Sequence, residues 1–218
     1  MKRFFCLLAG IFLISSVACS VVSAVSDFEY WNEESIEVSL TDRLSAEIEA
    51  DFKFNDNASK HYYTSTDLGL TYEFLDWFEG GVGYKQKYEL KKAEWKGESR
   101  PYILCGIEWK LADWKFKNKA RLEYRMKQGG DELFRFRDKL TIKSPWKWTQ
   151  LGINPYVADE IFIQEKDNFY KNRTYAGIGL KLFEHVEAEI YYLLEIEKED
   201  SGWDKYTDVL GTELTLKF

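Results

Sequence analysis

The sequence predicts an all-β protein, a single antiparallel transmembrane β-barrel of about twelve strands. Three observations predict it. Hydrophobic residues recur with a period of two almost throughout residues 25–218, which is the period of a β-strand. Most alternating segments run for about 10–13 residues, enough for a tilted strand to cross a bilayer, whereas strands of soluble domains average about 5–6. Tight turns also alternate with longer polar links, as in an outer-membrane barrel.

The first 24 residues have the features of a secretory signal peptide. A short basic start precedes an apolar run over residues 4–14, which is too short to span a bilayer as a helix. Val22-Ser23-Ala24 then suits the small-residue cleavage pattern. An alternative uses Cys19 as the acylation site of a lipoprotein. In either case we expect an exported protein with one barrel domain over residues 25–218.

The elements of this domain follow from the alternation. The clearest strands set apolar side chains against mainly ionic ones, over residues 44–54, 114–125, 187–197 and 210–218. Tight turns are expected at residues 41–43, 75–77, 111–113, 144–147 and 183–185. Longer links are expected at residues 55–61, 91–99, 127–132, 163–172 and 198–205. We expect the short turns to face the periplasm and the longer links to face outward. No segment has a 3.6-residue stripe, so we expect no helix.

The number of strands needs one further assumption. Eleven strands are clear from Tyr30 to Phe218. A closed antiparallel barrel from a single chain normally has an even number. We therefore expect an additional first strand around Val25–Trp31, with a tight reversal at Asn32–Ser35, which gives twelve. Ten is possible if one hairpin is a loop excursion.

Aromatic side chains gather at the predicted strand ends, as they do in the two interfacial belts of membrane barrels. The tight turns carry Trp77, Trp109, Trp114, Trp146 and Trp148. Nearer the longer links are Tyr62, Tyr63, Tyr88, Tyr124, Phe134, Phe162 and Tyr206.

Composition argues against several classes of function. The formal charge is −7 and no basic block is present, so clustered cations for nucleic-acid phosphates are missing. Two His and three Cys leave little material for a metal site. Hydrolases built on such barrels use a Ser–His pair, but Ser59 and His61 lie in a polar loop, and His185 lies in a turn at the opposite end. We expect no enzyme, cofactor or metal.

Alternation alone does not say which face of each strand points inward. A soluble sandwich or an exported soluble ligand-binding barrel would turn its apolar face inward. The length of the strands, the large apolar residues with few small ones to fit a tapering interior, and the long ionic side chains that could pair across a lumen favour the inverse arrangement.

With that orientation the inward charges separate into two walls. The basic wall consists of Lys85, Lys87, Arg100, Lys115, Lys117, Lys119, Arg121, Arg125, Arg135, Arg137 and Lys139. The acidic wall consists of Glu37, Glu47, Glu49, Asp51, Glu187, Glu189, Glu195, Glu197 and Glu213. If the first and last strands meet, the acidic strands become neighbours and face the basic ones. The walls create either a transverse field across a narrow water-filled passage or a salt-bridged plug.

Two polar residues depart from this pattern. Asn118 and Asp138 fall on the lipid-facing side of adjacent strands, and their positions about the loop at 127–132 predict that they are direct cross-strand neighbours. A carboxylate at mid-depth on this face is destabilising. Either a bulge re-aims them or they mark a protein–protein contact. The bulge is the preferred interpretation.

Several short stretches carry a resemblance to a known family. They are Leu40-Thr41-Asp42-Arg43-Leu44, Phe134-Arg135-Phe136-Arg137 leading to Ser144-Pro145, Asn154-Pro155-Tyr156 with Glu160 and Phe162, and Asn172-Arg173-Thr174-Tyr175 with Gly177 and Gly179. Together they resemble an uncharacterised bacterial barrel family, catalogued as domain of unknown function 2490, over nearly the whole mature chain. The resemblance implies an outer-membrane location and offers no known substrate. The terminal Phe218 is also similar to the signal by which barrel-assembly machinery recognises its clients.

These observations lead to one expectation about function. We expect a monomer in the outer membrane of a Gram-negative envelope, surrounded by lipid and delivered by barrel-assembly machinery. It acts as a narrow porin-like channel for small polar or anionic solutes, or as a plugged structural barrel.

Overall fold

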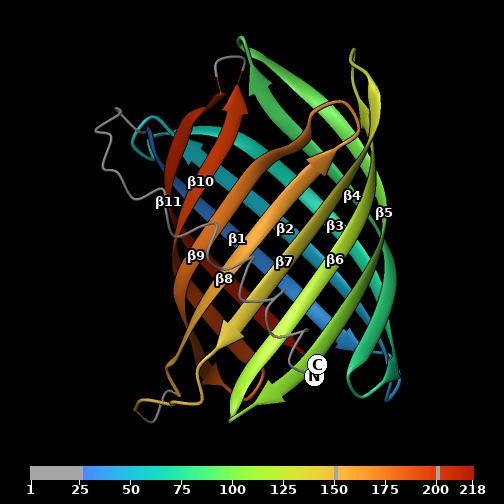
Figure 1. Cartoon of the computed structure of the whole chain (residues 1–218), viewed down its shortest axis with the longest axis vertical. Coiled ribbons are helices and arrows are strands. Elements are labelled where there is room, and N and C mark those ends of the chain that lie inside the picture. Colours follow the sequence, from blue (N-terminus) through green and yellow to red (C-terminus); the bar gives the residue numbers. More distant parts are fainter. Residues whose placement is uncertain (1–26, 150–151, 200–201) are drawn as a thin grey trace, which may run out of the picture.

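The computed structural model describes residues 27–149, 152–199 and 202–218 of the chain. In these ranges, eleven strands form one sheet that closes on itself into a barrel (Figure 1). The signal peptide predicted over residues 1–24 lies outside the described residues. The same ranges contain no helix with the length and hydropathy needed to cross a membrane.

The strands follow one another round the barrel in chain order. They are β1 (Asp27–Ser39), β2 (Leu44–Asn55), β3 (Lys60–Leu75), β4 (Phe78–Lys91), β5 (Glu94–Leu111), β6 (Trp114–Lys127), β7 (Glu132–Lys143), β8 (Asn154–Gln164), β9 (Asn168–Phe183), β10 (Val186–Glu199) and β11 (Gly202–Lys217). We call the end with the β1–β2, β3–β4 and β5–β6 connections the turn end and the opposite end the loop end. The predicted all-β class and single barrel are confirmed.

The barrel closes through a parallel pair. Every pair of consecutive strands is antiparallel, so with eleven strands β1 and β11 run in the same direction. They pair over residues 27–37 and 207–217. The reversal predicted at Asn32–Ser35 is wrong, because β1 runs straight through it and pairs with β11 on one side and β2 on the other. Two partners satisfy the backbone groups of this stretch without a turn.

The two ends differ less in loop length than the sequence predicts. The polar stretch 91–99 is nearly all strand, since β4 runs to Lys91 and β5 begins at Glu94. Polar side chains do not end a strand when the neighbouring backbone still offers hydrogen-bond partners. Conversely, the tight turn predicted at 144–147 is only the first part of a longer connection, residues 144–153, at the turn end (Figure 1). Asn154 Nδ2 stabilises it by donating to the carbonyl oxygens of Ser144 (2.7 Å) and Trp146 (2.9 Å).

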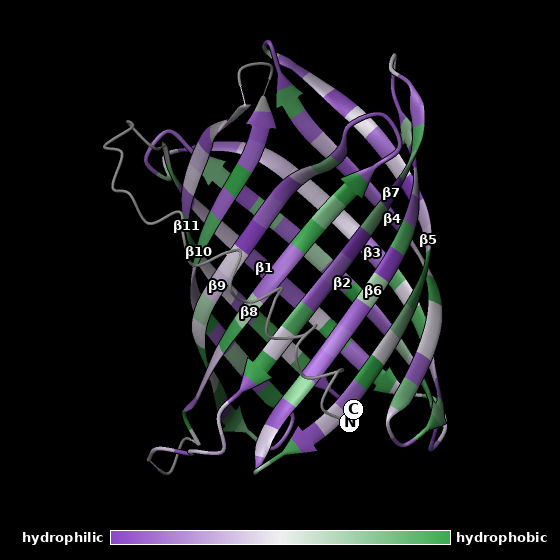
Figure 2. Ribbon diagram, viewed as in Figure 1, coloured by the Kyte–Doolittle hydropathy of each residue, from purple (hydrophilic) through white to green (hydrophobic). Residues whose placement is uncertain are grey.

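Apolar side chains cover the outside of the barrel and ionic side chains fill the inside. Hydrophobic and hydrophilic residues alternate along the strands in Figure 2. Leu68 is 51% exposed and Ile103 58% exposed on the outer face, while Glu123 is 1% exposed inside. The inverse arrangement expected from the sequence is therefore the one adopted, and apolar Leu122 and Ile190 do not meet in the interior.

The predicted aromatic belts are only partly on the outer face. Tyr88 and Phe134 are exposed on it near the loop end, and Trp77 and Trp146 are exposed at the turn end. Phe162, in contrast, is 1% exposed and lies inside the barrel. Tyr62, Tyr63 and Tyr206 also lie on the inner surface, where they line the cavity. These four residues are inner-wall residues, because closeness to a strand end says nothing about which face a side chain occupies.

Candidate functional site in the barrel interior

The inward side chains enclose a cavity of about 1340 Å3. It begins at the loop end, where Lys166 and Asp167 line it, and reaches the depth of Lys119 and Glu47. Seventeen Lys and Arg side chains line it against eleven Asp and Glu side chains, counted over the described residues. The cavity is therefore polar and carries an excess of positive charge.

Most of the predicted lumen residues line this cavity. From the basic wall these are Lys85, Lys87, Arg100, Lys119, Arg121, Arg125, Arg135, Arg137 and Lys139. From the acidic wall they are Glu47, Glu49, Asp51, Glu195, Glu197 and Glu213. The parallel closure makes β10, β11, β1 and β2 consecutive, so the acidic strands are neighbours, as predicted.

The other predicted residues lie nearer the turn end and form local ion pairs. Lys115 is 2.8 Å from Glu108, and Lys117 is 3.2 Å from Glu79. The same holds for the pairs Glu187–Lys217 (2.8 Å), Glu189–Lys143 (2.8 Å) and Glu37–Lys217 (3.9 Å). None of these five predicted residues lines the cavity.

Charge segregation is weaker than the sequence predicts, because each wall contains opposite charges that the prediction missed. The basic side holds buried Asp67, Glu98, Glu123 and Glu160. The acidic side holds Lys53, Lys171 and Arg173. Strand alternation does place Glu98 with Arg100 and Glu123 with Arg125, and this was the available signal.

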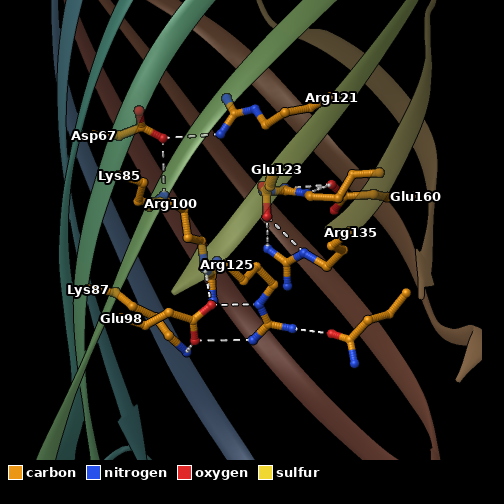
Figure 3. Close-up of polar contacts among 12 residues, drawn as sticks. Asp67, Lys85, Lys87, Glu98, Arg100, Arg121, Glu123, Arg125, Arg135 and Glu160 are labelled. Carbon is orange, nitrogen blue, oxygen red and sulfur yellow. Dashed lines mark hydrogen bonds and ion pairs between the residues drawn. The ribbon is translucent and has the colours of Figure 1, made fainter. Parts of the chain in front are cut away.

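Glu98 on β5 is the centre of one buried cluster (Figure 3). Its Oε1 accepts hydrogen bonds from Arg100 Nε at 2.6 Å and from Arg125 Nε at 2.5 Å. Lys87 Nζ lies 3.3 Å from the other oxygen. Arg125 also donates to Gln164 Oε1 on β8. One carboxylate thus neutralises cations from three strands, and Arg125 extends the cluster past β7 to β8.

A second cluster connects β6, β7 and β8 (Figure 3). Glu123 accepts hydrogen bonds from Arg135, and its Oε1 lies 3.1 Å from Arg137 Nη1. Arg137 Nη2 lies 2.6 Å from Glu160 Oε1. Because Arg137 contacts two nearly fully buried carboxylates, it is held between them, which satisfies charges that would otherwise be very costly to bury.

The chain of ion pairs continues through Arg173 on β9. Its Nε donates to Glu195 Oε2 at 2.7 Å, and its Nη1 lies 3.6 Å from Glu160 Oε2. Lys171 Nζ lies 2.9 Å from Glu195 Oε1, and Tyr175 donates to Glu160 Oε2 at 2.8 Å. Alternating charges therefore extend along the inner wall from β6 to β10.

A third cluster places one ammonium among three carboxylates. Lys85 Nζ lies 2.9 Å from Glu49, 2.7 Å from Asp51 and 3.7 Å from Asp67. Glu33, Glu49 and Asp51 also bring their carboxylate oxygens within 4.8 Å of one another, a spacing that could hold a hard cation. Lys85 already supplies the positive charge there, so this geometry does not favour a metal.

The Trp31 ring lies between two cations. Lys53 Nζ is 3.3 Å and the Arg173 guanidinium 4.7 Å from the ring centroid. Trp31 Nε1 donates to Glu29 Oε2 at 2.7 Å, and Tyr62 donates to the same oxygen at 2.6 Å. The ring therefore stabilises Lys53, for which no ion pair is found among the described residues, and adds to the ion pairs of Arg173.

On the outer face, Asn118 and Asp138 form a hydrogen-bonded pair. Asn118 Nδ2 lies 3.1 Å from both Asp138 oxygens. The β6–β7 register is continuous here, so the preferred interpretation as a bulge is wrong. The amide satisfies the carboxylate where it stands. A second such group, missed by sequence reasoning, lies on β8 and β9, where Asp159 accepts from Asn172 (3.1 Å) and Thr174 (3.3 Å).

The residues considered for hydrolysis are engaged separately. Ser59 Oγ donates to the carbonyl oxygen of Asp56 at 2.6 Å, and His61 Nε2 lies 2.9 Å from the carbonyl oxygen of Tyr63. His185 lies at the turn end, with Nδ1 2.7 Å from the Lys217 carbonyl oxygen. In this geometry neither histidine contacts Ser59.

An ion pair joins two connections at the loop end. Lys166 Nζ lies 2.6 Å from Asp131 Oδ2. The hydrogen bond from Lys166 lowers the pKa of the Asp131 carboxyl and raises the pKa of the Lys166 ammonium. Since the carboxylate is favoured, the pair is formed at neutral pH and is lost only as the pH falls into the acidic range of a carboxyl group.

Comparison with known proteins identifies a family. The model of a protein family of unknown function, DUF2490, matches residues 28–206. The chain therefore belongs to this family, and the resemblance seen in the sequence motifs is confirmed. A search of the curated proteins finds no match.

Proposed function

We propose that this DUF2490 protein is an outer-membrane β-barrel that acts as a narrow, porin-like channel for small polar or anionic solutes. It is exported through the signal peptide, inserted by barrel-assembly machinery, and surrounded by lipid as a monomer. The proposal includes no enzymatic activity and no cofactor.

One observation carries the membrane location: the large apolar side chains point outward while the ionic ones are enclosed. Exposed Leu, Ile, Val and Phe residues occur on the outer face of most strands. Monomeric soluble proteins rarely expose apolar patches larger than a few hundred Å2. In hydrocarbon the same surface is favourable, and the closed sheet satisfies its own backbone hydrogen bonds.

The cavity supports the channel. It is strongly polar and is lined by more Lys and Arg than Asp and Glu side chains. Near the loop end it is lined by Lys91, Lys127, Lys198 and Lys205. A low-dielectric wall concentrates the field of such charges, so anions should enter more readily than cations.

A plugged structural barrel is the second candidate, and a specific observation favours it. The cavity lining includes none of Glu37, Lys115 and Glu187 near the turn end. The ion pairs between β6 and β10 also fill much of the inner wall. Such a barrel would stabilise the envelope without conducting.

The two candidates, and a soluble barrel, are separated by two measurements. The protein should be extracted only with detergent and should change gel mobility on heating. In planar bilayers it should give discrete conductance steps with anion preference. Silent bilayers with heat-modifiable mobility would indicate the plugged barrel, and partition into the aqueous phase would contradict both membrane functions.

A matched pair of variants tests the charge at the mouth. Lys127→Glu, in the cavity lining, should shift the reversal potential in a salt gradient toward cations. Lys96→Glu lies outside the cavity, in an exposed pair with Glu94, and should leave the reversal potential unchanged. Equal effects of both variants would contradict entry through this cavity.

A further inference from the structure

We propose that the middle of the cavity binds a small zwitterion, a free amino acid or a short peptide. Lys119 and Lys139 bind its carboxylate, and the opposite wall binds its ammonium through Glu33, Glu47 and Glu213. This inference names the class of solute for the proposed channel. Binding is inferred from the cavity itself, and passage of the solute across the membrane rests on the proposed channel function.

The basic side of the site is a pair of like charges. Lys119 on β6 and Lys139 on β7 are directly opposite in the register, and both line the cavity. Like charges in this position repel and destabilise a sheet. Neither ammonium has a carboxylate oxygen within 4.0 Å in the part of the chain that the structure describes. Lys139 Nζ lies over the Tyr175 ring, 4.2 Å from its centroid, so the pair has an aromatic neighbour but no carboxylate partner and can bind an anionic group in the cavity.

The acidic side is a row of four carboxylates on consecutive strands. Glu189, Glu213, Glu33 and Asp51 are directly opposite one another across β10, β11, β1 and β2. The outer two are neutralised, Glu189 by Lys143 at 2.8 Å and Asp51 by Lys85 at 2.7 Å.

Within the described ranges, the middle of this row makes no direct ion pair, since Lys85 contacts the neighbouring Glu49 and Asp51. Among the described residues, Glu33 and Glu213 have no Lys or Arg nitrogen within 4.0 Å, and neither does Glu47, which lines the same cavity. Two adjacent carboxylates repel each other, and a cation that approaches from the cavity relieves this repulsion.

The rest of the interior shows that this fold can pair its charges. Glu98, Glu123, Glu160 and Glu195 each contact at least two cations. Lys119, Lys139, Glu33, Glu47 and Glu213, in contrast, make no ion pair with any described residue and all line one cavity. A fold that only filled its lumen would gain stability by pairing them as well.

The two walls face each other. Round the ring of eleven strands, β6 is five strands from β1 in one direction and six in the other, which makes them opposite. Glu47 on β2 and Glu213 on β11 line the same cavity as Lys119 and Lys139 and make no ion pair with either among the described residues. The cavity therefore separates the two lysines on one wall from the glutamates on the other.

This arrangement selects a zwitterion over a singly charged solute. An anion at Lys119 and Lys139 alone would leave the carboxylates of the other wall unpaired. A cation at the glutamates alone would leave the two ammonium groups repelling each other. A zwitterion pairs its carboxylate with the lysines and its ammonium with the glutamates at the same time. Both ion pairs are strengthened by the reduced dielectric constant of the cavity.

The test uses four forms of one peptide with the purified mature protein in detergent. Trialanine is zwitterionic, its N-acetyl form is an anion, its amide is a cation, and the doubly blocked form is neutral. Titration calorimetry should show trialanine binding about tenfold more tightly than either singly charged form. The neutral form should show no binding.

Variants assign each charge to its wall. Lys119→Gln with Lys139→Gln should weaken trialanine binding to the level of the amide form. Glu33→Gln with Glu213→Gln should weaken it to the level of the N-acetyl form. Lys115→Gln, which lies outside the cavity, should bind as the unaltered protein does. Heat-modifiable mobility checks that each variant folds, and if one wall's variant does not fold, the other provides the test.

The outcomes separate the site from the channel. Equal affinity for the N-acetyl form and trialanine, or for all four forms, would overturn the zwitterion site even if the protein conducts. Selective binding of trialanine in a protein that is silent in bilayers would uphold the site and overturn the channel. Block of the conductance by trialanine alone would support both.

Discussion

At the scale of single residues, close packing of tyrosine side chains against glycines shapes the inner wall. A Cβ added to Gly177 would lie 2.7 Å from Tyr191 Cβ and 2.9 Å from the Ile190 carbonyl oxygen. A Cβ added to Gly179, two residues further along β9, would meet nothing closer than 3.7 Å. Tyr191 and its neighbour Tyr156 are both buried inside the barrel. Glycine is therefore needed at position 177 for packing.

We predict that Gly177→Ala lowers stability by about 1–3 kcal/mol, because the added methyl group must displace Tyr191 or the β10 backbone. Gly179→Ala is the matched control and should change stability by less than about 0.5 kcal/mol. The temperature at which gel mobility changes on heating measures both. Similar midpoints for the two variants would contradict the packing argument.

A second prediction concerns the buried carboxylate Glu123. Glu123→Gln leaves the guanidinium groups of Arg135 and Arg137 short of negative charge, and should destabilise the barrel by about 3–5 kcal/mol. Glu108→Gln, which removes a partly exposed ion pair with Lys115, should cost less than about 1 kcal/mol. Urea unfolding monitored by tryptophan fluorescence compares the two. A small effect at Glu123 would mean that water from the cavity screens this cluster.

At the scale of the elements, the pairing of β1 with β11 decides the strand number. Ser35 and Thr215 are directly opposite in this pair, with hydroxyl oxygens 3.0 Å apart. A twelve-stranded barrel with a reversal at Asn32–Ser35 would separate them. The two residues therefore report on the closure.

We predict that Ser35→Cys with Thr215→Cys, in a Cys105→Ser background, forms a cross-link under mild oxidation. Gel mobility of the unfolded protein measures it. Ser35→Cys with Thr207→Cys, eight residues away along β11, should remain uncross-linked. Cross-linking of only the second pair, or of neither, would contradict the parallel closure.

Strand periodicity was sufficient to predict most elements and faces, but not their pairing. The alternation around Lys85, Arg100 and Glu195 placed these side chains inside correctly, because every second residue of a strand shares a face. It could not show that Glu123 meets Arg135, since partners depend on register between strands. Asn118 and Asp138 were placed on the correct face and on neighbouring strands, but the register makes them diagonal rather than directly opposite, because Asn118 pairs with Leu140.

At the scale of the whole molecule, the orientation of the two faces can be tested with the native thiol. Cys105 lies on the outer face of β5 and is exposed there. Removal of residues 1–24 would leave it as the only cysteine. We predict that a charged maleimide fails to label it in liposomes and labels it after unfolding in SDS. Cysteine at Ser59, in the β2–β3 connection, is the control and should react in both states.

Rapid labelling of Cys105 in the folded protein would place water against the outer face and contradict the membrane location. The sequence predicted this orientation from strand length and from the bulk of the apolar residues. It could not predict the odd strand number, because that depends on which edges meet after the sheet has curled. Nor could it locate the cavity, which depends on how inward side chains from all strands pack together.

The parallel seam also has a mechanical consequence. A parallel ladder is slightly less stable per residue than an antiparallel one, and β1–β11 is the one such ladder in the described barrel. A force that pulls the strands of the barrel apart should therefore break the hydrogen bonds between β1 and β11 first. In a pulling experiment, the first rupture should release the edges of β1 and β11 and leave the ten antiparallel ladders as a connected sheet.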